Sequence, residues 1–222
     1  MVLLPGGALA HDLWLSTTGK QWTLYQGHRH STHDGADTVP YTSGFVTRAR
    51  CLDAEGKQGP LAVAANAPWS ASGDCAALRL DVSSGYWSKT PWETKNVPKN
   101  EAPGALKSWL ALESLLLIER WNVALAKPAG SGLELLPTAD PFLLKPGDKL
   151  VVRATHDGKP LVEAPVAYHG ETRGTTDADG RIAIRLRHRG VQLISTSLET
   201  RLNDGKADRE IRSATLQFSL PQ

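Results

Sequence analysis

Short segments of β type, bounded by turn residues, recur along nearly the whole chain of 222 residues. Apolar and polar residues alternate in several of them, which is typical of strands with one buried face. Turn residues cluster between them, as at 145–148 (Lys-Pro-Gly-Asp) and 157–160 (Asp-Gly-Lys-Pro). This spacing predicts a mostly β protein of the sandwich or barrel type. We expect strands over residues 14–25, 45–52, 61–64, 76–82, 150–154, 162–168, 181–187, 191–198 and 213–220.

Two stretches depart from the strand pattern and suggest a division into two units. Residues 83–100 combine aromatics, lysines and prolines without periodicity, which predicts a long ordered loop. Residues 104–121 carry a stripe at helical spacing, which predicts one connecting α-helix. After the Pro/Gly/Ser linker we expect two β-sandwich-like units, residues 11–130 and residues 133–222, the second immunoglobulin-like or transthyretin-like. The stripe comprises Leu106, Trp109, Leu110, Glu113, Leu117, Arg120 and Trp121.

The balance of charge excludes some partners. The chain has 25 basic and 23 acidic residues and a formal net charge of +2, so it offers no concentrated basic face for nucleic acid. No apolar run approaches the ~20 residues that span a bilayer, so we expect no transmembrane segment.

The N-terminus and the cysteines both indicate export. Residues 1–10 are apolar and end in Ala8-Leu9-Ala10, the small-x-small form of a signal-peptidase site. We interpret them as the remnant of a signal segment cleaved after Ala10; the alternative is an ordinary apolar tail. Cys51 and Cys75 predict one disulfide in an oxidising compartment, the alternative being two buried free thiols.

Four of the seven histidines fall near the N-terminus: His11, His28, His30 and His33. Neutral imidazole is the commonest nitrogen ligand of transition metals, so this density predicts a metal site. His28 and His30 are two residues apart, which places them on one face if the strand continues. After cleavage the α-amine of His11 would become a second donor beside its imidazole. The alternative is that one or two of these histidines are exposed loop residues.

The donor set limits the metal but does not select it. Nitrogen ligands without thiolate suit Ni(II), Co(II), Cu(II) or Zn(II). Nearby carboxylates could supply oxygen ligands or orient the imidazoles. These are Asp12, Asp34 and Asp37. We interpret the three remaining histidines as surface or hydrogen-bonded side chains: His156, His169 and His188.

Several segments resemble a family of extracytoplasmic proteins associated with nickel and cobalt uptake, which belongs to a broad domain of unknown function. The resemblance implies periplasmic metal binding and delivery to a membrane transporter of the energy-coupling-factor type. It places the candidate ligands at His11, His28 and His30, with Ni(II) or Co(II) as the metal. The matching segments are residues 10–15 (Ala-His-Asp-Leu-Trp-Leu), 27–31 (Gly-His-Arg-His-Ser), 84–90, 146–150, 158–160 and 176–180.

Two other functions stay open. An N-terminal histidine and a second histidine on a β-sandwich also resemble the copper brace of enzymes that cleave polysaccharides oxidatively. The chain could instead be a non-catalytic interaction module, because fold does not fix function. We expect no catalysis, since neither a nucleophile elbow nor a metalloprotease helix motif is present. The loop over residues 86–99 would dock the transporter or cover the metal, or its Trp87 and Trp92 would pack against the sandwich.

Overall fold

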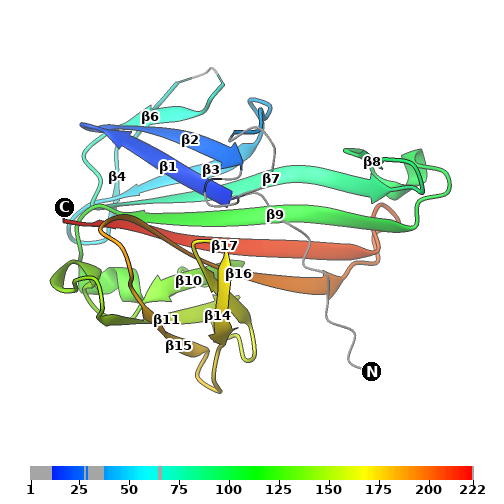
Figure 1. Ribbon diagram of the computed structural model, residues 1–222. Coiled ribbons are helices and arrows are strands. Elements are labelled where there is room, and N and C mark those ends of the chain that lie inside the picture. Colours follow the sequence, from blue (N-terminus) through cyan, green and yellow to red (C-terminus); the bar gives the residue numbers. More distant parts are fainter. Residues whose placement is uncertain (1–11, 28, 30–37, 65–66, 222) are drawn as a thin grey trace.

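The computed structural model describes residues 12–27, 29, 38–64 and 67–221. They form three stacked β-sheets, with the largest in the middle (Figure 1). Within these residues the helical segments are three single turns of 3₁₀-helix: η1 (Lys99–Glu101), η2 (Val123–Ala126) and η3 (Pro141–Leu143). None of the helices in this part of the chain has the length and apolar character needed to cross a membrane.

The central sheet has nine strands in the order β14-β13-β16-β17-β9-β7-β3-β4, and β8 pairs with β7. Its neighbouring strands are antiparallel except for β17 and β9, which run parallel. Its strands are β3 (Val46–Leu52), β4 (Gln58–Gly59), β7 (Ala77–Lys89), β8 (Thr94–Lys95), β9 (Lys107–Ile118), β13 (Pro165–Tyr168), β14 (Glu171–Thr175), β16 (Gly190–Arg201) and β17 (Arg209–Leu220).

A smaller sheet covers each face of the central sheet. The first has the order β1-β2-β6-β5, and the second contains β10, β11 and β12, with β15 paired to β11. The first sheet comprises β1 (Asp12–Thr18), β2 (Gln21–Gly27), β5 (Ala62–Val63) and β6 (Ser70–Ser72). The second comprises β10 (Leu133–Pro137), β11 (Lys149–His156), β12 (Lys159–Pro160) and β15 (Arg181–Arg185).

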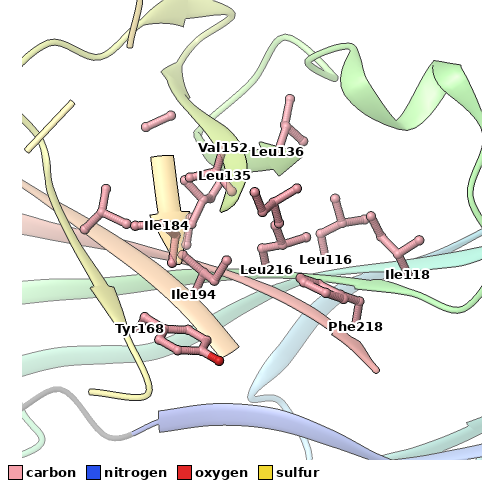
Figure 2. Close-up of a cluster of buried hydrophobic side chains, with 14 of the residues drawn as sticks. Leu116, Ile118, Leu135, Leu136, Val152, Tyr168, Ile184, Ile194, Leu216 and Phe218 are labelled. Carbon is pink, nitrogen blue, oxygen red and sulfur yellow. The ribbon is translucent and has the colours of Figure 1, made fainter. Parts of the chain in front are cut away.

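Each interface between sheets contains its own hydrophobic core. Leu115 and Leu117 of β9 pack in the core beneath β1 and β2. Leu116 and Ile118, which alternate with them, pack in the core beneath β10 and β11 (Figure 2). Successive side chains of a strand point to opposite faces, so this strand is apolar on both sides because both sides are covered.

The predicted helix over residues 104–121 is wrong, because this segment forms β9. The continuous run from Leu115 to Ile118 is buried residue by residue, as in a strand at the centre of a layered structure. The helical stripe matched only because an unbroken apolar run satisfies a period of 3.6 as readily as a period of 2.

Two further segments differ from their predictions. Residues 14–25, expected as one strand, form the hairpin of β1 and β2, because Gly19 adopts a positive φ of 61° between them. The predicted loop over residues 83–100 starts later than expected, since residues 83–89 continue β7. A bulge between Ser83 and Gly85 disturbs the alternation there, which explains the missing strand signal.

The predicted boundary between two units, near residues 130–133, lies between η2 and β10. Strands from both sides of it nevertheless share the central sheet, and β9 pairs with β17 along nine consecutive positions from Trp109 to Leu117. The β-rich prediction is confirmed, and hydrogen bonding is continuous between the two halves of the chain.

The predicted disulfide is confirmed. Cys51 of β3 is bonded to Cys75, and both side chains lie in the core beneath β1 and β2. Such a bond agrees with an extracytoplasmic compartment, where disulfides persist.

Candidate functional sites: the edge at β1 and β2 and a charged cleft

The four predicted metal ligands, His11, His28, His30 and His33, lie outside the described residues, and so do Asp34 and Asp37. The described chain next to them is well defined. Asp12, the first residue of β1, pairs with Gly27, the last residue of β2. Gly27 also forms a bridge with Thr38, and the Val39 amide donates to the Gln26 carbonyl at 2.7 Å.

Three points of the chain therefore meet at one edge of the first sheet: Asp12, Gly27 and Thr38. Each is joined by a peptide bond to the segment that carries predicted ligands, residue 11 before Asp12 and residues 28 to 37 between the other two. Trp22 and Leu24 of β2 are buried in the core beneath the first sheet. The chain thus leaves a firmly seated strand at the position where the histidines begin.

Arg29 is, with Gly27, one of the two described residues of the Gly-His-Arg-His motif. Its guanidinium carbon lies 5.5 Å from the ring centroid of Trp14, and that ring stacks on Tyr25 at 5.8 Å. Burial lowers the pKa of Arg29, and the carboxylate of Asp12 opposes this shift. Asp12 therefore acts on a neighbouring cation at this edge, a role that the sequence had not suggested.

A hollow of about 340 Å³ adjoins the same edge. Tyr41 holds its wall in place, because its hydroxyl donates to the Leu24 carbonyl at 2.6 Å and accepts from the Trp69 amide at 2.9 Å. Burial raises the pKa of this tyrosine, so the hydroxyl stays protonated at neutral pH. The lining residues are Leu24, Tyr25, Gln26, Thr38, Val39, Pro40, Tyr41, Ala67 and Pro68.

Elsewhere in the described chain no three His, Cys, Asp or Glu side chains are placed to hold a metal ion. His169 and His188 lie near each other, with ring centroids 5.4 Å apart beside Tyr168. His156 is 3.7 Å from a carboxylate oxygen of Asp157.

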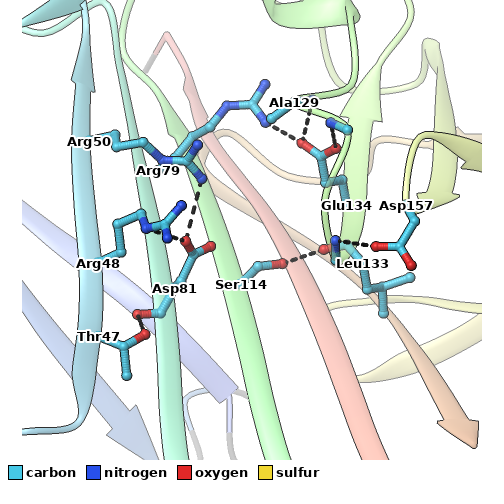
Figure 3. Close-up of polar contacts among 12 residues, drawn as sticks. Thr47, Arg48, Arg50, Arg79, Asp81, Ser114, Ala129, Leu133, Glu134 and Asp157 are labelled. Atoms are coloured by element: carbon cyan, nitrogen blue, oxygen red, sulfur yellow. Dashed lines mark hydrogen bonds and ion pairs between the residues drawn. The ribbon is translucent and has the colours of Figure 1, made fainter.

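A second hollow, of about 430 Å³, lies between the central sheet and β10. On one wall Asp81 of β7 contacts Arg50 at 3.4 Å and Arg48 at 3.8 Å (Figure 3). On the other wall Glu134 of β10 forms a buried ion pair with Arg79. The charges in this cleft are thus largely neutralised by each other.

The Glu134 carboxylate also forms hydrogen bonds with the linker that precedes β10. It accepts hydrogen bonds from the amides of Ala129 and Gly130 at 3.0 and 3.3 Å (Figure 3). The cleft lining includes neither histidine nor cysteine among the described residues, so it lacks the parts of a nucleophile–histidine pair. The polar contacts of Glu134 in this cleft join β10 to β7 of the central sheet.

Glu113 is a further unusual group, and it belongs to the stripe whose spacing predicts a helix. In β9 it is aligned with Val82 on one side and Ser213 on the other. Burial raises its pKa to about 7, and a hydrogen bond with Ser213 partly opposes that shift. No sequence signal could have found it, because its burial depends on strands distant in the chain.

Comparison with known proteins places the chain in a family. No curated protein matches it. The fibronectin(III)-like modules of Clostridium thermocellum CbhA align with 94% of this chain and 95% of theirs, at 11% identity and a TM-score of 0.24. The model of the domain of unknown function DUF4198 matches residues 8–200. Because this match spans most of the sequence, the chain belongs to the DUF4198 family.

Proposed function

We propose that this protein is a periplasmic transition-metal-binding protein, which captures Ni(II) or Co(II) and delivers it to an inner-membrane uptake transporter of the energy-coupling-factor type. The observation that supports it best is the meeting of Asp12, Gly27 and Thr38 at one edge of the first sheet. Every predicted ligand belongs to the segments attached to these three residues.

The strand register brings two of the described neighbours of the ligands together. Asp12 and Gly27 are directly paired in β1 and β2, and paired strand residues have Cα atoms about 4.5 to 5.5 Å apart. Asp12 follows residue 11 and Gly27 precedes residue 28 in the sequence. The pairing therefore supports the proposal that His11 and His28 bind one ion together.

A titration tests the proposal. Ni(II), Co(II), Cu(II) and Zn(II) are added to the protein beginning at His11 and to a form that retains residues 1–10, and heat release is measured. We expect tight Ni(II) or Co(II) binding, weakened at least tenfold in His11→Ala and in the double variant His28→Ala/His30→Ala. His156→Ala is the matched control, since it removes an imidazole far along the chain, and we expect unchanged affinity.

The outcomes separate the alternatives. Weaker binding in the extended form assigns the terminal amine as a donor, whereas equal binding removes the amine from the site. Copper binding with peroxide-dependent cleavage of polysaccharide would replace the transport proposal by the copper-brace enzyme. If neither form binds metal, or if His156→Ala weakens binding as much as the N-terminal variants, the proposal is wrong.

A further inference from the structure

The central sheet projects beyond the two smaller sheets as an arm. Its four longest strands, β7, β9, β16 and β17, have 12 or 13 residues each, and one end of this ribbon extends past the other layers (Figure 1). The core beneath β1 and β2 stops at Val82 on β7 and at Leu115 on β9. We call the end formed by residues 89–95 and 105–107 the arm tip.

The arm tip is held by specific hydrogen bonds. Thr90, which is buried, closes the turn after β7, since its amide donates to the Glu93 carbonyl at 2.9 Å. Its hydroxyl oxygen accepts from the amides of Trp92 and Glu93 at 3.3 and 3.2 Å. On the other side, the Leu106 amide donates to the Lys89 carbonyl at 2.8 Å. The tip is therefore a preorganised element rather than a loose loop.

This ordered tip presents two large apolar side chains to solvent. Trp92 is 85% exposed and Leu106 is 68% exposed. The other tryptophans of the arm behave differently, because Trp87 and Trp109 stack on each other at 6.4 Å. Single exposed apolar side chains are common on protein surfaces, so the tip is a candidate contact surface because they occur together with the charges described next.

Basic side chains surround these apolar groups. Lys89 and Lys107 are directly paired across β7 and β9, and both are exposed. Like charges placed opposite each other destabilise a sheet, and neither ammonium has an ion pair with the residues that the structure describes. Lys95 adds a third ammonium and is paired to Glu93 at 2.8 Å. The tip thus carries a net positive charge that is complementary to an anionic surface.

We propose that the arm tip docks on an anionic lipid surface, with Trp92 and Leu106 inserted at the headgroup level and Lys89 and Lys107 over anionic headgroups. Tryptophan beside lysine is the composition that favours the boundary between water and hydrocarbon. Trp92 and Leu106 line neither of the two hollows described above, which favours a lipid surface over a shaped protein pocket. The proposal uses only described residues and stands without the metal site.

Cosedimentation with vesicles tests the docking, with the full chain and no added metal. Phosphatidylglycerol–phosphatidylcholine vesicles are compared with phosphatidylcholine alone. We expect binding only to the anionic vesicles and a decrease with added salt. Each lysine near such a surface contributes about fivefold in affinity, so Lys89→Glu/Lys107→Glu should weaken binding at least 25-fold. Trp92→Ala/Leu106→Ala should weaken it about tenfold.

Two matched controls locate the effect. Leu143→Ala removes an apolar side chain that is 82% exposed on η3, and Lys159→Glu reverses an exposed lysine on β12. Both should bind anionic vesicles like the unaltered protein, and circular dichroism should show that every variant is folded.

Three results would overturn the proposal. They are absence of binding to anionic vesicles at low salt, equal losses in the control and arm variants, and binding to an acidic polysaccharide but not to vesicles. The last result would assign the tip to a polyanionic sugar.

Discussion

Replacing Glu113 by Gln should remove a large pH dependence of stability. Burial raises the pKa of this carboxyl from its ordinary value of 4.5 to about 7. Between these two values the folded protein retains a proton that the unfolded chain has released. Stability therefore falls as pH rises from about 4.5 to about 7, because the folded state binds more protons than the unfolded state.

The size of the effect follows from the shift. The two pKa values differ by roughly 2.5, and at about 1.4 kcal/mol for each pKa unit this corresponds to about 3.5 kcal/mol. Glutamine cannot ionise, so Glu113→Gln should be more stable than the unaltered protein by up to this amount at pH 8. At pH 4 the two proteins should be similar, since the carboxyl is then protonated in both states.

Urea unfolding at a series of pH values measures the difference between the two proteins, with the disulfide kept oxidised. The difference in stability between the two proteins is more informative than either pH curve, because other carboxylates titrate in both. The pKa of Asp208, for example, is lowered mainly by its hydrogen bond with Lys99, so this group makes the fold more stable as pH rises. Ser213→Ala supplies an internal check: it removes the hydrogen bond that lowers the Glu113 pKa, so the descending part of the curve should extend to higher pH. A difference independent of pH, or a Gln variant less stable at pH 8, would refute the reasoning.

Three further changes test contacts that join the layers. Glu134→Gln should destabilise the fold by about 3 to 5 kcal/mol in urea unfolding, because it leaves the buried Arg79 without its carboxylate, whereas Glu134→Gln combined with Arg79→Met should recover much of that loss. Cys51→Ser/Cys75→Ser should lower stability by about 3 kcal/mol through the entropy of a loop with sequence separation 24, and a reducing agent should reproduce this loss in the unaltered protein alone. Gln217→Ala should cost about 1 to 3 kcal/mol and increase amide hydrogen exchange in β1, because the Gln217 side chain both donates to and accepts from the β1 backbone; unchanged exchange would contradict that role.

The turns, which are recognisable from local sequence, account for most of the strands that the sequence predicts correctly. Asp53 accepts hydrogen bonds from two amides within its turn, and Asp177 does the same in the turn before β15. Both devices are local, so the sequence displays them as Asp followed by Gly at a fixed short distance. The residues between such turns are predicted to be strands, and the structure confirms most of these strands with shifted ends.

Pairing between strands that are distant in the sequence cannot be predicted from local residue patterns. The parallel pairing of β9 with β17 joins residues about a hundred positions apart, and no periodicity in either segment encodes it. The same limit explains the misassigned helix, because only the two covering sheets make an unbroken apolar strand stable. For the candidate sites, the sequence supplied the histidines, whereas the meeting of Asp12, Gly27 and Thr38 required the strand register.

The edge at β1 and β2 is connected to the arm by hydrogen bonds between the first sheet and the central sheet. The amide and carbonyl of Leu15 in β1 are bonded to the side chain of Gln217, so the first sheet is fixed to β17, a strand that continues into the arm. At the other end of this hairpin, Thr17 and Trp22 both donate to Glu119, just after β9 ends. Asp12 and Gly27 are consequently at the end of the hairpin that faces the arm (Figure 1). A protein docked by its arm tip would therefore hold this edge at a set height above the bilayer, and metal bound there would be released close to the membrane.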